Sequence, residues 1–206
     1  MKPLTSPGRR WCAALLAAAL AGCGSTPTDH FYTLSGGPQT PVPPAAGAPL
    51  YIEMRPATVP ARLRRPQLVL GGGADRIELA EHHRWAGPLA EEIRAALSLG
   101  IAGRLGAVDV YRSAAPAAGT VFRIGADVQR FESRPGDYAL IDAVWSVRRL
   151  GGGEVQTCRS VFQERVGAGH DALVAGHRAA LGKLSDTIAQ AVRGQAEGRA
   201  PACPPA

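Results

Sequence analysis

Histidine is the residue type in this chain best suited to bind a metal ion. His82 and His83 are adjacent, so on a strand their side chains would point to opposite faces, which is poor geometry for one ion. His170 and His177 are seven residues apart, but His170 precedes a predicted helix and His177 lies among leucines. We therefore expect partly buried histidines with hydrogen-bond partners and no metal site.

Acidic side chains and glycine runs are the next candidates for chemistry. Glu81, Asp127 and Glu132 could supply an acid/base pair, but strand alternation places Asp127 and Glu132 on opposite faces. The glycines at 71–73 and 151–153 are not followed by Lys-Ser or Lys-Thr, so they indicate turns rather than phosphate loops. The sequence also has no Gly-x-Ser-x-Gly, Cys-x-x-Cys or His-Glu-x-x-His motif. We predict a non-enzymatic protein without a cofactor, so any ATP hydrolysis would belong to a partner.

The amino end of the chain has the design of a secretory signal peptide. Lys2, Arg9 and Arg10 supply positive charge, and residues 11–21 form an apolar run of 11 residues that ends in small side chains. A membrane-spanning helix needs about 20 residues, so this run is too short for a comfortable anchor. We predict that residues 1–22 are a signal peptide.

A cysteine with a chemistry of its own follows this run. Leu-Ala-Gly-Cys at positions 20–23 resembles the bacterial lipobox, in which the cysteine thiol receives a diacylglycerol, the peptide is cut before it, and the new amino terminus is acylated. Cys23 would then be the lipid attachment site, and two or three acyl chains make attachment effectively permanent. The alternative is an ordinary secretory signal with a cysteine near the cut. Gly24, where aspartate would signal inner-membrane retention, implies the outer membrane, facing the periplasm.

Much of the net charge lies in the predicted signal peptide. The whole chain has 23 basic and 17 acidic residues, a formal net charge of +6. Removal of residues 1–22 takes away three basic and no acidic residues, which leaves 184 residues with a net charge of +3. The remaining charges are interspersed and form no basic stripe of the kind that binds nucleic acid. This length suits one domain with extended ends.

Two cysteines remain once Cys12 leaves with the signal peptide and Cys23 is acylated. Cys158 and Cys203 could form a disulfide in an oxidising periplasm. The bond would fix a carboxyl-terminal tail that has little other reason to be ordered. In the alternative, Cys158 is a small buried strand residue and Cys203 is a mobile thiol.

The mature sequence divides into a tether, one domain and a tail. Residues 23–49 are rich in proline, and their one apolar patch, Phe-Tyr-Thr-Leu at 31–34, is predicted to dock on the domain as a short strand. Residues 50–193 carry the periodic patterns of a folded domain. Residues 194–206 are predicted to be a flexible tail.

Hydrophobic periodicity predicts the elements of the domain. The predicted strands are residues 50–54, 67–70, 77–79, 108–111, 122–128, 141–147 and 155–166. Turn residues join the second and third strands into a hairpin and the last three into an antiparallel meander. Amphipathic helices are predicted at 88–106 and 171–194. The expected fold is α+β, a mostly antiparallel sheet with two amphipathic helices packed on one face as a two-layer sandwich.

Particular residues mark the limits of the two helices. Pro88 suits the first turn of one helix, Gly106 its end, and Asp171 is positioned to cap the other helix. Gly100 and Gly103 each cost about 1 kcal/mol relative to alanine inside a helix. We therefore expect either close packing at these glycines or an early end of the helix.

Histidine, arginine and tryptophan gather at the junction between the third predicted strand and the first helix, residues 81–89. Arg84, Trp85 and Pro88 lie in this junction. Tryptophan and arginine are favoured in protein interfaces, so these three residues are the candidate partner interface. In the alternative interpretation, Trp85 is a core residue that closes the end of the helix.

Several short motifs resemble those of one family. They are Phe-Tyr-Thr-Leu at 31–34, Val-Pro at 59–60, Arg-Pro-Gln at 65–67 and Arg-Trp-Ala-Gly-Pro-Leu at 84–89. With the lipobox, they are similar to the ABC-type transport auxiliary lipoproteins of the paraquat-inducible protein C type, from about residue 30 to 193. The resemblance implies a non-enzymatic outer-membrane lipoprotein with a fold similar to the amino-terminal domain of TolB.

The resemblance also implies partners. They are an MCE-domain protein and an inner-membrane ABC permease or ATPase, which together bridge the periplasm and move lipids between the membranes. This chain would dock the end of the MCE assembly at the outer membrane, and copies of it could form a ring.

Two other functions are compatible with the same features. One is an outer-membrane lipoprotein that reaches through the cell wall to activate a peptidoglycan synthase. The roughly 26 residues from 24 to 49 would span about 90 Å fully extended but about 30 Å on average as a flexible coil, which favours a partner near the outer membrane. The other is a periplasmic lipid-binding module, which would need a cavity beside the packed core.

Overall fold

The computed structural model describes residues 27–36, 49–71, 76–114 and 118–203. The predicted signal peptide, Cys23, most of the tether and part of the first glycine turn lie outside these residues. Within the described ranges, no helix combines the length and the apolar character needed to cross a membrane.

The larger sheet has five strands in the order β5-β2-β6-β7-β8. They are β2 (Leu50–Met54), β5 (Val108–Asp109), β6 (Thr120–Arg134), β7 (Tyr138–Arg149) and β8 (Gln156–Arg165). β6, β7 and β8 form the predicted antiparallel meander. β2, in contrast, runs parallel to both of its neighbours, β5 and β6.

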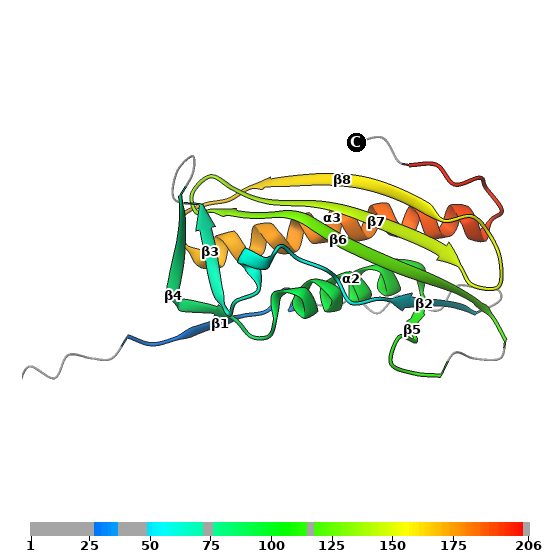
Figure 1. Ribbon diagram of the computed structural model, residues 1–206, viewed down its shortest axis with the longest axis horizontal. Helices are drawn as coiled ribbons and strands as arrows, with labels where there is room; N and C mark the ends of the chain where they lie inside the picture. Colours follow the sequence, from blue (N-terminus) through cyan, green and yellow to red (C-terminus); the bar gives the residue numbers. More distant parts are fainter. Residues whose placement is uncertain (1–26, 37–48, 72–75, 115–117, 204–206) are drawn as a thin grey trace, which may run out of the picture.

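A smaller sheet lies at one end of the molecule, where β3 and β4 run across the direction of the long strands (Figure 1). Its order is β1-β4-β3, with β1 at His30–Tyr32, β3 at Gln67–Gly71 and β4 at Ile77–Trp85. β3 and β4 form the predicted hairpin. β1 is the docked strand expected within the tether, and it runs parallel to β4.

The prediction of a mostly antiparallel sheet is therefore wrong, because both sheets are mixed. Parallel neighbours need a long connection, and here a helix separates β2 from β5 and β6, while β2 and β3 separate β1 from β4. Alternation within one strand indicates which side is buried. It does not indicate the direction of a neighbour that is distant in sequence.

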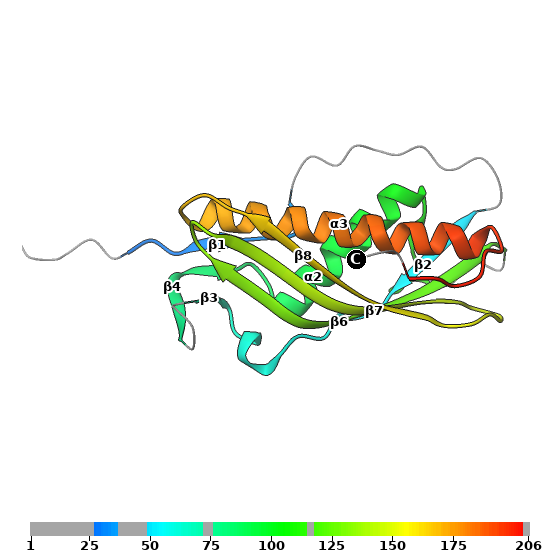
Figure 2. The same cartoon turned by 90° about the horizontal axis from the view of Figure 1, so that it is seen from above.

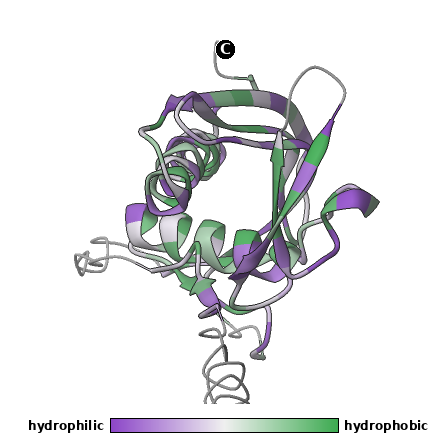
Figure 3. Ribbon diagram, turned by 90° about the vertical axis from the view of Figure 1, so that its left-hand side faces the viewer, coloured by the Kyte–Doolittle hydropathy of each residue, from purple (hydrophilic) through white to green (hydrophobic). Residues whose placement is uncertain are grey.

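Two helices, α2 (Leu89–Leu105) and α3 (His170–Ala196), cover one face of the larger sheet and pack against each other (Figure 2). In the end-on view, the sheet bends around the helices (Figure 3). The α+β class and the two helices are as predicted.

The helix ends follow the prediction in part. Pro88 directly precedes α2, and Gly106 ends it in the left-handed conformation with φ of 61°. Asp171 does not cap α3 but lies in its first turn, because Gly169 holds the cap position with φ of 90°, which favours glycine. The helix begins at His170 and continues to Ala196, two residues beyond its predicted end.

The two helices approach each other closely at Gly100. A Cβ on this residue would lie 2.5 Å from Ser185 Oγ and 2.9 Å from Ser185 Cβ, so only glycine fits without a shift. Close packing is therefore the correct interpretation of Gly100. A Cβ on Gly103 would meet no atom of the described chain within 4 Å.

A single core lies between the helices and the larger sheet and extends under the smaller one. The buried stripe of α2 recurs every four residues, at Leu89, Ile93, Leu97, Ile101 and Leu105. Trp145 of β7 is fully buried, and its Nε1 donates to Ser160 Oγ at 3.0 Å. Leu34, just after β1, and Leu68 of β3 are buried in the same core, so the smaller sheet is fixed to the rest of the domain.

The carboxyl-terminal segment turns back from α3 to the edge strand β8. Gln156 Nε2 donates to Ala202 O at 2.7 Å, and a disulfide joins Cys158 and Cys203, whose Cα atoms are 5.6 Å apart. Residues 194–196 belong to α3. The segment predicted as a tail is thus helical at its start and attached to β8 near its end.

Candidate functional site

Trp85 is the last residue of β4 and lies where the smaller sheet meets α2. Its backbone N–H donates to Pro66 O at 2.8 Å, and Ala86 N–H donates to Tyr32 O at 2.7 Å. The indole is 5% exposed and packs edge-on against Phe131. Trp85 is thus a core residue at this end of the domain, as the alternative interpretation held.

A cleft of about 730 Å³ opens beside Trp85, among β1, β4, the start of α2 and the segment around the short helix η1 (Ala61–Leu63). Its apolar lining includes Phe31, Ala57, Val59, Trp85, Pro88 and Leu89. Phe31 is 65% exposed. The exposed ring of Phe31 thus lies beside an apolar cleft, which makes this region the candidate interaction site.

The three residues of the predicted interface, Arg84, Trp85 and Pro88, all line this cleft. Phe31 and Arg64, which were not predicted to belong to the interface, line it too. The motifs around them were visible in the sequence. However, no local pattern placed them beside Trp85.

Three arginines line the cleft, and a backbone carbonyl orients each of them. The Nε atoms of Arg64, Arg65 and Arg84 donate to carbonyls three to five residues earlier in the chain, at 3.4, 3.0 and 3.3 Å. Arg84 also forms an ion pair with Asp29 at 3.6 Å. The cleft therefore combines an apolar lining with fixed positive charge.

β1, which carries Phe31, is held by contacts from both helices. Glu92 Oε2 of α2 accepts hydrogen bonds from Thr33 Oγ1 at 2.7 Å and Leu34 N–H at 2.8 Å. Arg178 of α3 donates from Nη2 to Thr33 O at 2.6 Å. These contacts fix the position of Phe31 relative to the rest of the cleft.

Three histidines stack where β1, β4 and α3 meet. The ring of His83 lies 3.6 Å from that of His170 and 4.9 Å from that of His30, centroid to centroid. Burial, followed by the charges of His170 and His30, lowers the pKa of His83. Stacked rings do not converge on one point, and no group of three His, Cys, Asp or Glu residues among those described could hold a metal ion.

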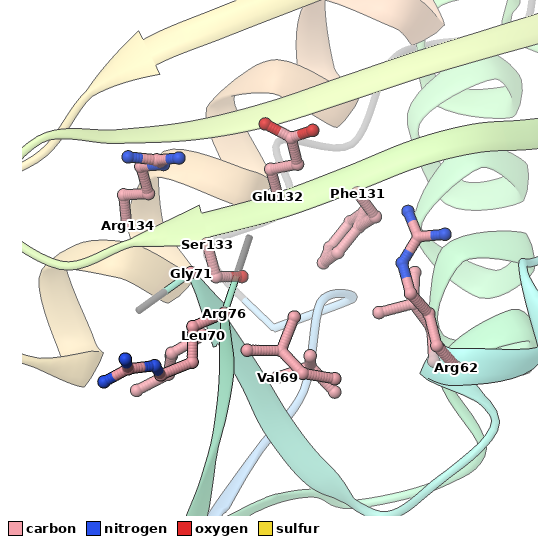
Figure 4. A pocket seen from close by; sticks show the side chains of 11 residues that line it. Arg62, Val69, Leu70, Gly71, Arg76, Phe131, Glu132, Ser133 and Arg134 are labelled. Carbon is pink, nitrogen blue, oxygen red and sulfur yellow. The ribbon is translucent and has the colours of Figure 1, made fainter. Parts of the chain in front are cut away.

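A smaller pocket of about 280 Å³ lies between β3 and β6 (Figure 4). Ser133 lines it, and its Oγ lies 2.8 Å from Nε2 of His177, a contact like that of a nucleophile and its base. However, burial lowers the pKa of His177 to about 3, which makes the ring a poor base near neutral pH. His177 Nδ1 also has no hydrogen-bond partner in the described part of the chain, so no third group orients the ring.

The carboxylates considered for acid/base chemistry bind neighbouring side chains. Glu132 accepts hydrogen bonds from Arg130 Nε at 2.9 Å and Tyr138 Oη at 2.8 Å, and the bond from Arg130 holds the pKa of Glu132 below its usual value. Asp127 accepts a hydrogen bond from Gln129 Nε2 at 2.7 Å. Both carboxylates thus have structural partners on the sheet.

The structure is thus an α+β domain with an apolar, arginine-lined cleft. The chain belongs to the family of ABC-type transport auxiliary lipoprotein components, because the model of that family matches residues 32–189. This match confirms the resemblance seen in the sequence. The family is auxiliary to ABC-type transport, which implies transporter partners.

Solved structures share the fold. A crystal structure of an uncharacterised protein superposes with a TM-score of 0.62 at 18% identity, covering 81% of this chain and 99% of that one. Protein XCC0632 from Xanthomonas campestris gives a TM-score of 0.59 at 16% identity, covering 82% of this chain and 99% of its own. At these identities, the likeness shows the fold alone. The comparison with curated proteins gives no significant match.

Proposed function

We propose that acyl chains on Cys23 hold this protein at the outer membrane, facing the periplasm. There the domain docks the end of a periplasm-spanning MCE assembly that belongs to an ABC-type lipid transporter. The family supports an auxiliary role in transport. The proposal adds the MCE-domain protein, the inner-membrane permease or ATPase, and the lipid cargo.

The observation that carries the proposal is the short chain between the lipid anchor and the cleft. β1 begins at His30, seven residues after Cys23, and the next residue, Phe31, lines the cleft. Seven residues span at most about 25 Å when fully extended. An acylated Cys23 would therefore keep this side of the domain within about 25 Å of the membrane surface, where a docking protein must lie.

The same distance counts against an activator of a peptidoglycan synthase. The tether considered from the sequence runs to residue 49, but β1 attaches to the domain at residues 30–32. The reach of the domain is therefore set by the residues before β1. A protein that must pass through the cell wall needs a longer connection.

The proposal is tested by crosslinking the acylated protein in its own membrane and purifying it through a carboxyl-terminal tag. Mass spectrometry identifies the bound chains, and the size of any homo-oligomer shows whether copies form a ring. We expect an MCE-domain protein with a permease or ATPase. Recovery of a cell-wall synthase in their place would contradict the proposal.

A periplasmic lipid-binding module is a second candidate, which the size of the cleft favours. Its volume of about 730 Å³ falls within the range of small-molecule pockets, roughly 300–1,000 Å³. Organic extraction of the purified protein, followed by phosphate analysis, tests this function. One phospholipid per chain would support a lipid-binding module, and a ratio near zero would favour docking.

A further inference from the structure

We infer that the cleft beside Trp85 binds a short apolar segment of the docked partner that also carries acidic residues. This inference rests on the proposed docking function and adds the chemistry of the partner's segment. Two features carry it, namely an apolar wall with one exposed aromatic ring and three separately held arginines.

The apolar wall is already packed before a partner arrives. Ala57, Val59 and Trp85 are about 5% exposed and belong to the core, so the surface they present is rigid. Phe31 is 65% exposed beside them. An apolar side chain seated in the cleft would cover Phe31 and bury it against this wall, as happens at the centre of interfaces rich in tryptophan and arginine.

The positive charges of the cleft favour acidic residues in the partner's segment. Arg64, Arg65 and Arg84 line the cleft, and each donates from Nε to a different backbone carbonyl, which orients its guanidinium group. Carboxylates on the docked polypeptide would pair with these guanidinium groups, and a crosslink to a lipid would identify a phosphate as the anion instead. The ion pair of Arg84 with Asp29 shows that a carboxylate fits against one of these arginines.

Asp29 of the chain itself pairs with Arg84, whereas no ion pair of Arg64 or Arg65 is found among the described residues. Residues 1–26 and 37–48, which lie outside the described structure, contain no aspartate or glutamate. A second copy would bring the same net positive charge, +3 for the mature chain, and not a net negative one. A separate, acidic partner fits the cleft better than either of these.

The test places the photoreactive residue benzoylphenylalanine at position 31 of the full-length, acylated protein. This replacement keeps an aromatic ring at an exposed site. The protein is irradiated in its native membrane, and the crosslinked peptide is sequenced by mass spectrometry. The same experiment is repeated with Arg64→Glu and Arg65→Glu together, and with Arg148→Glu as a matched control on β7, outside the cleft. Thermal unfolding checks that each variant is folded.

We expect the crosslinked peptide to hold apolar residues together with aspartate or glutamate. Reversal of the two cleft charges should lower the crosslinking yield about tenfold, because like charges would then face each other, whereas Arg148→Glu should leave it unchanged. The inference is overturned by a crosslink to a lipid, to the chain itself or to a second copy. It is also overturned by a peptide without acidic residues, by a yield that resists charge reversal, or by no crosslink from the folded protein.

The identity of the crosslinked protein tests the docking function separately. An acidic, apolar segment from an MCE-domain protein would support both the inference and the proposed function. The same kind of segment from a cell-wall synthase would support the chemistry of the cleft and contradict the proposed function.

Discussion

His177 is a titratable residue held neutral inside the core. Its ring stacks on that of Phe131 at 3.8 Å, and burial lowers its pKa to about 3. An unfolded chain has a histidine pKa of about 6.5. Between these two values the unfolded state binds more protons than the folded state. Stability is therefore present above pH 6.5 and is lost as the pH falls towards 3, by up to about 1.4 kcal/mol per pH unit.

This loss should be smaller in the double variant Ser133→Ala, His177→Leu. The apolar pair does not titrate, and it removes both partners of the buried hydrogen bond instead of leaving one unsatisfied. We expect the free energy of unfolding of the variant to fall less steeply between pH 6.5 and 4 than that of the wild type. Urea unfolding at a series of pH values measures the difference. Parallel profiles would mean that His177 does not titrate as described.

Some residues of the cleft could be predicted from the sequence and others could not. Arg84, Trp85 and Pro88 were predictable because they form one dense motif at a strand-to-helix junction. Phe31 and Arg64 line the same cleft, but at least 20 residues separate each of them from Trp85. Their place depends on the pairing of β1 with β4 and on the path of the chain after η1, and neither leaves a local pattern.

At the scale of elements, the contact between α2 and α3 depends on one of the two glycines inside α2. Gly100→Ala would place a Cβ against the buried Ser185, whose Oγ already donates to Leu181 O, so we expect a loss of about 1–3 kcal/mol of stability. Gly103→Ala is the matched control three residues away. It should gain up to about 1 kcal/mol, because its methyl group meets open space and alanine favours the helix.

Denaturant unfolding of the two alanine variants gives this comparison directly. Opposite signs for the two substitutions are the expected outcome. Equal gains would mean that the helices can separate at Gly100 without cost, and the close contact would then not stabilise the fold.

Elements were predicted well where their pattern is local, and poorly where it is not. The meander and both helices follow from the spacing of apolar residues within each segment. The parallel direction of β1 could not be predicted, because its partner residues in β4 are distant in the chain, as in the pair His30 and His83. The same holds for β2 and β6, which pair across the whole of α2.

At the scale of the whole molecule, the disulfide attaches the carboxyl-terminal segment to the edge strand β8. It links residues 45 apart in sequence, and a crosslink over such a loop stabilises a domain by about 2–4 kcal/mol. We expect Cys203→Ser to lose this amount and to keep partner binding. Cys158→Ser should behave alike, and reduction of the wild type should reproduce the loss. Unchanged stability of Cys203→Ser would mean that the bond is absent from the mature protein.

The account as a whole depends on one claim, that the cleft beside Trp85 receives the transport partner at the outer membrane. The most direct test compares Phe31→Asp with Val161→Asp, which introduces the same charge at another exposed apolar residue, on β8. Each acylated variant is purified from its own membrane after crosslinking, and the amount of MCE-domain protein recovered is measured. The account predicts that Phe31→Asp loses the partner and Val161→Asp retains it. Retention of the partner by Phe31→Asp at the wild-type level would contradict the claim.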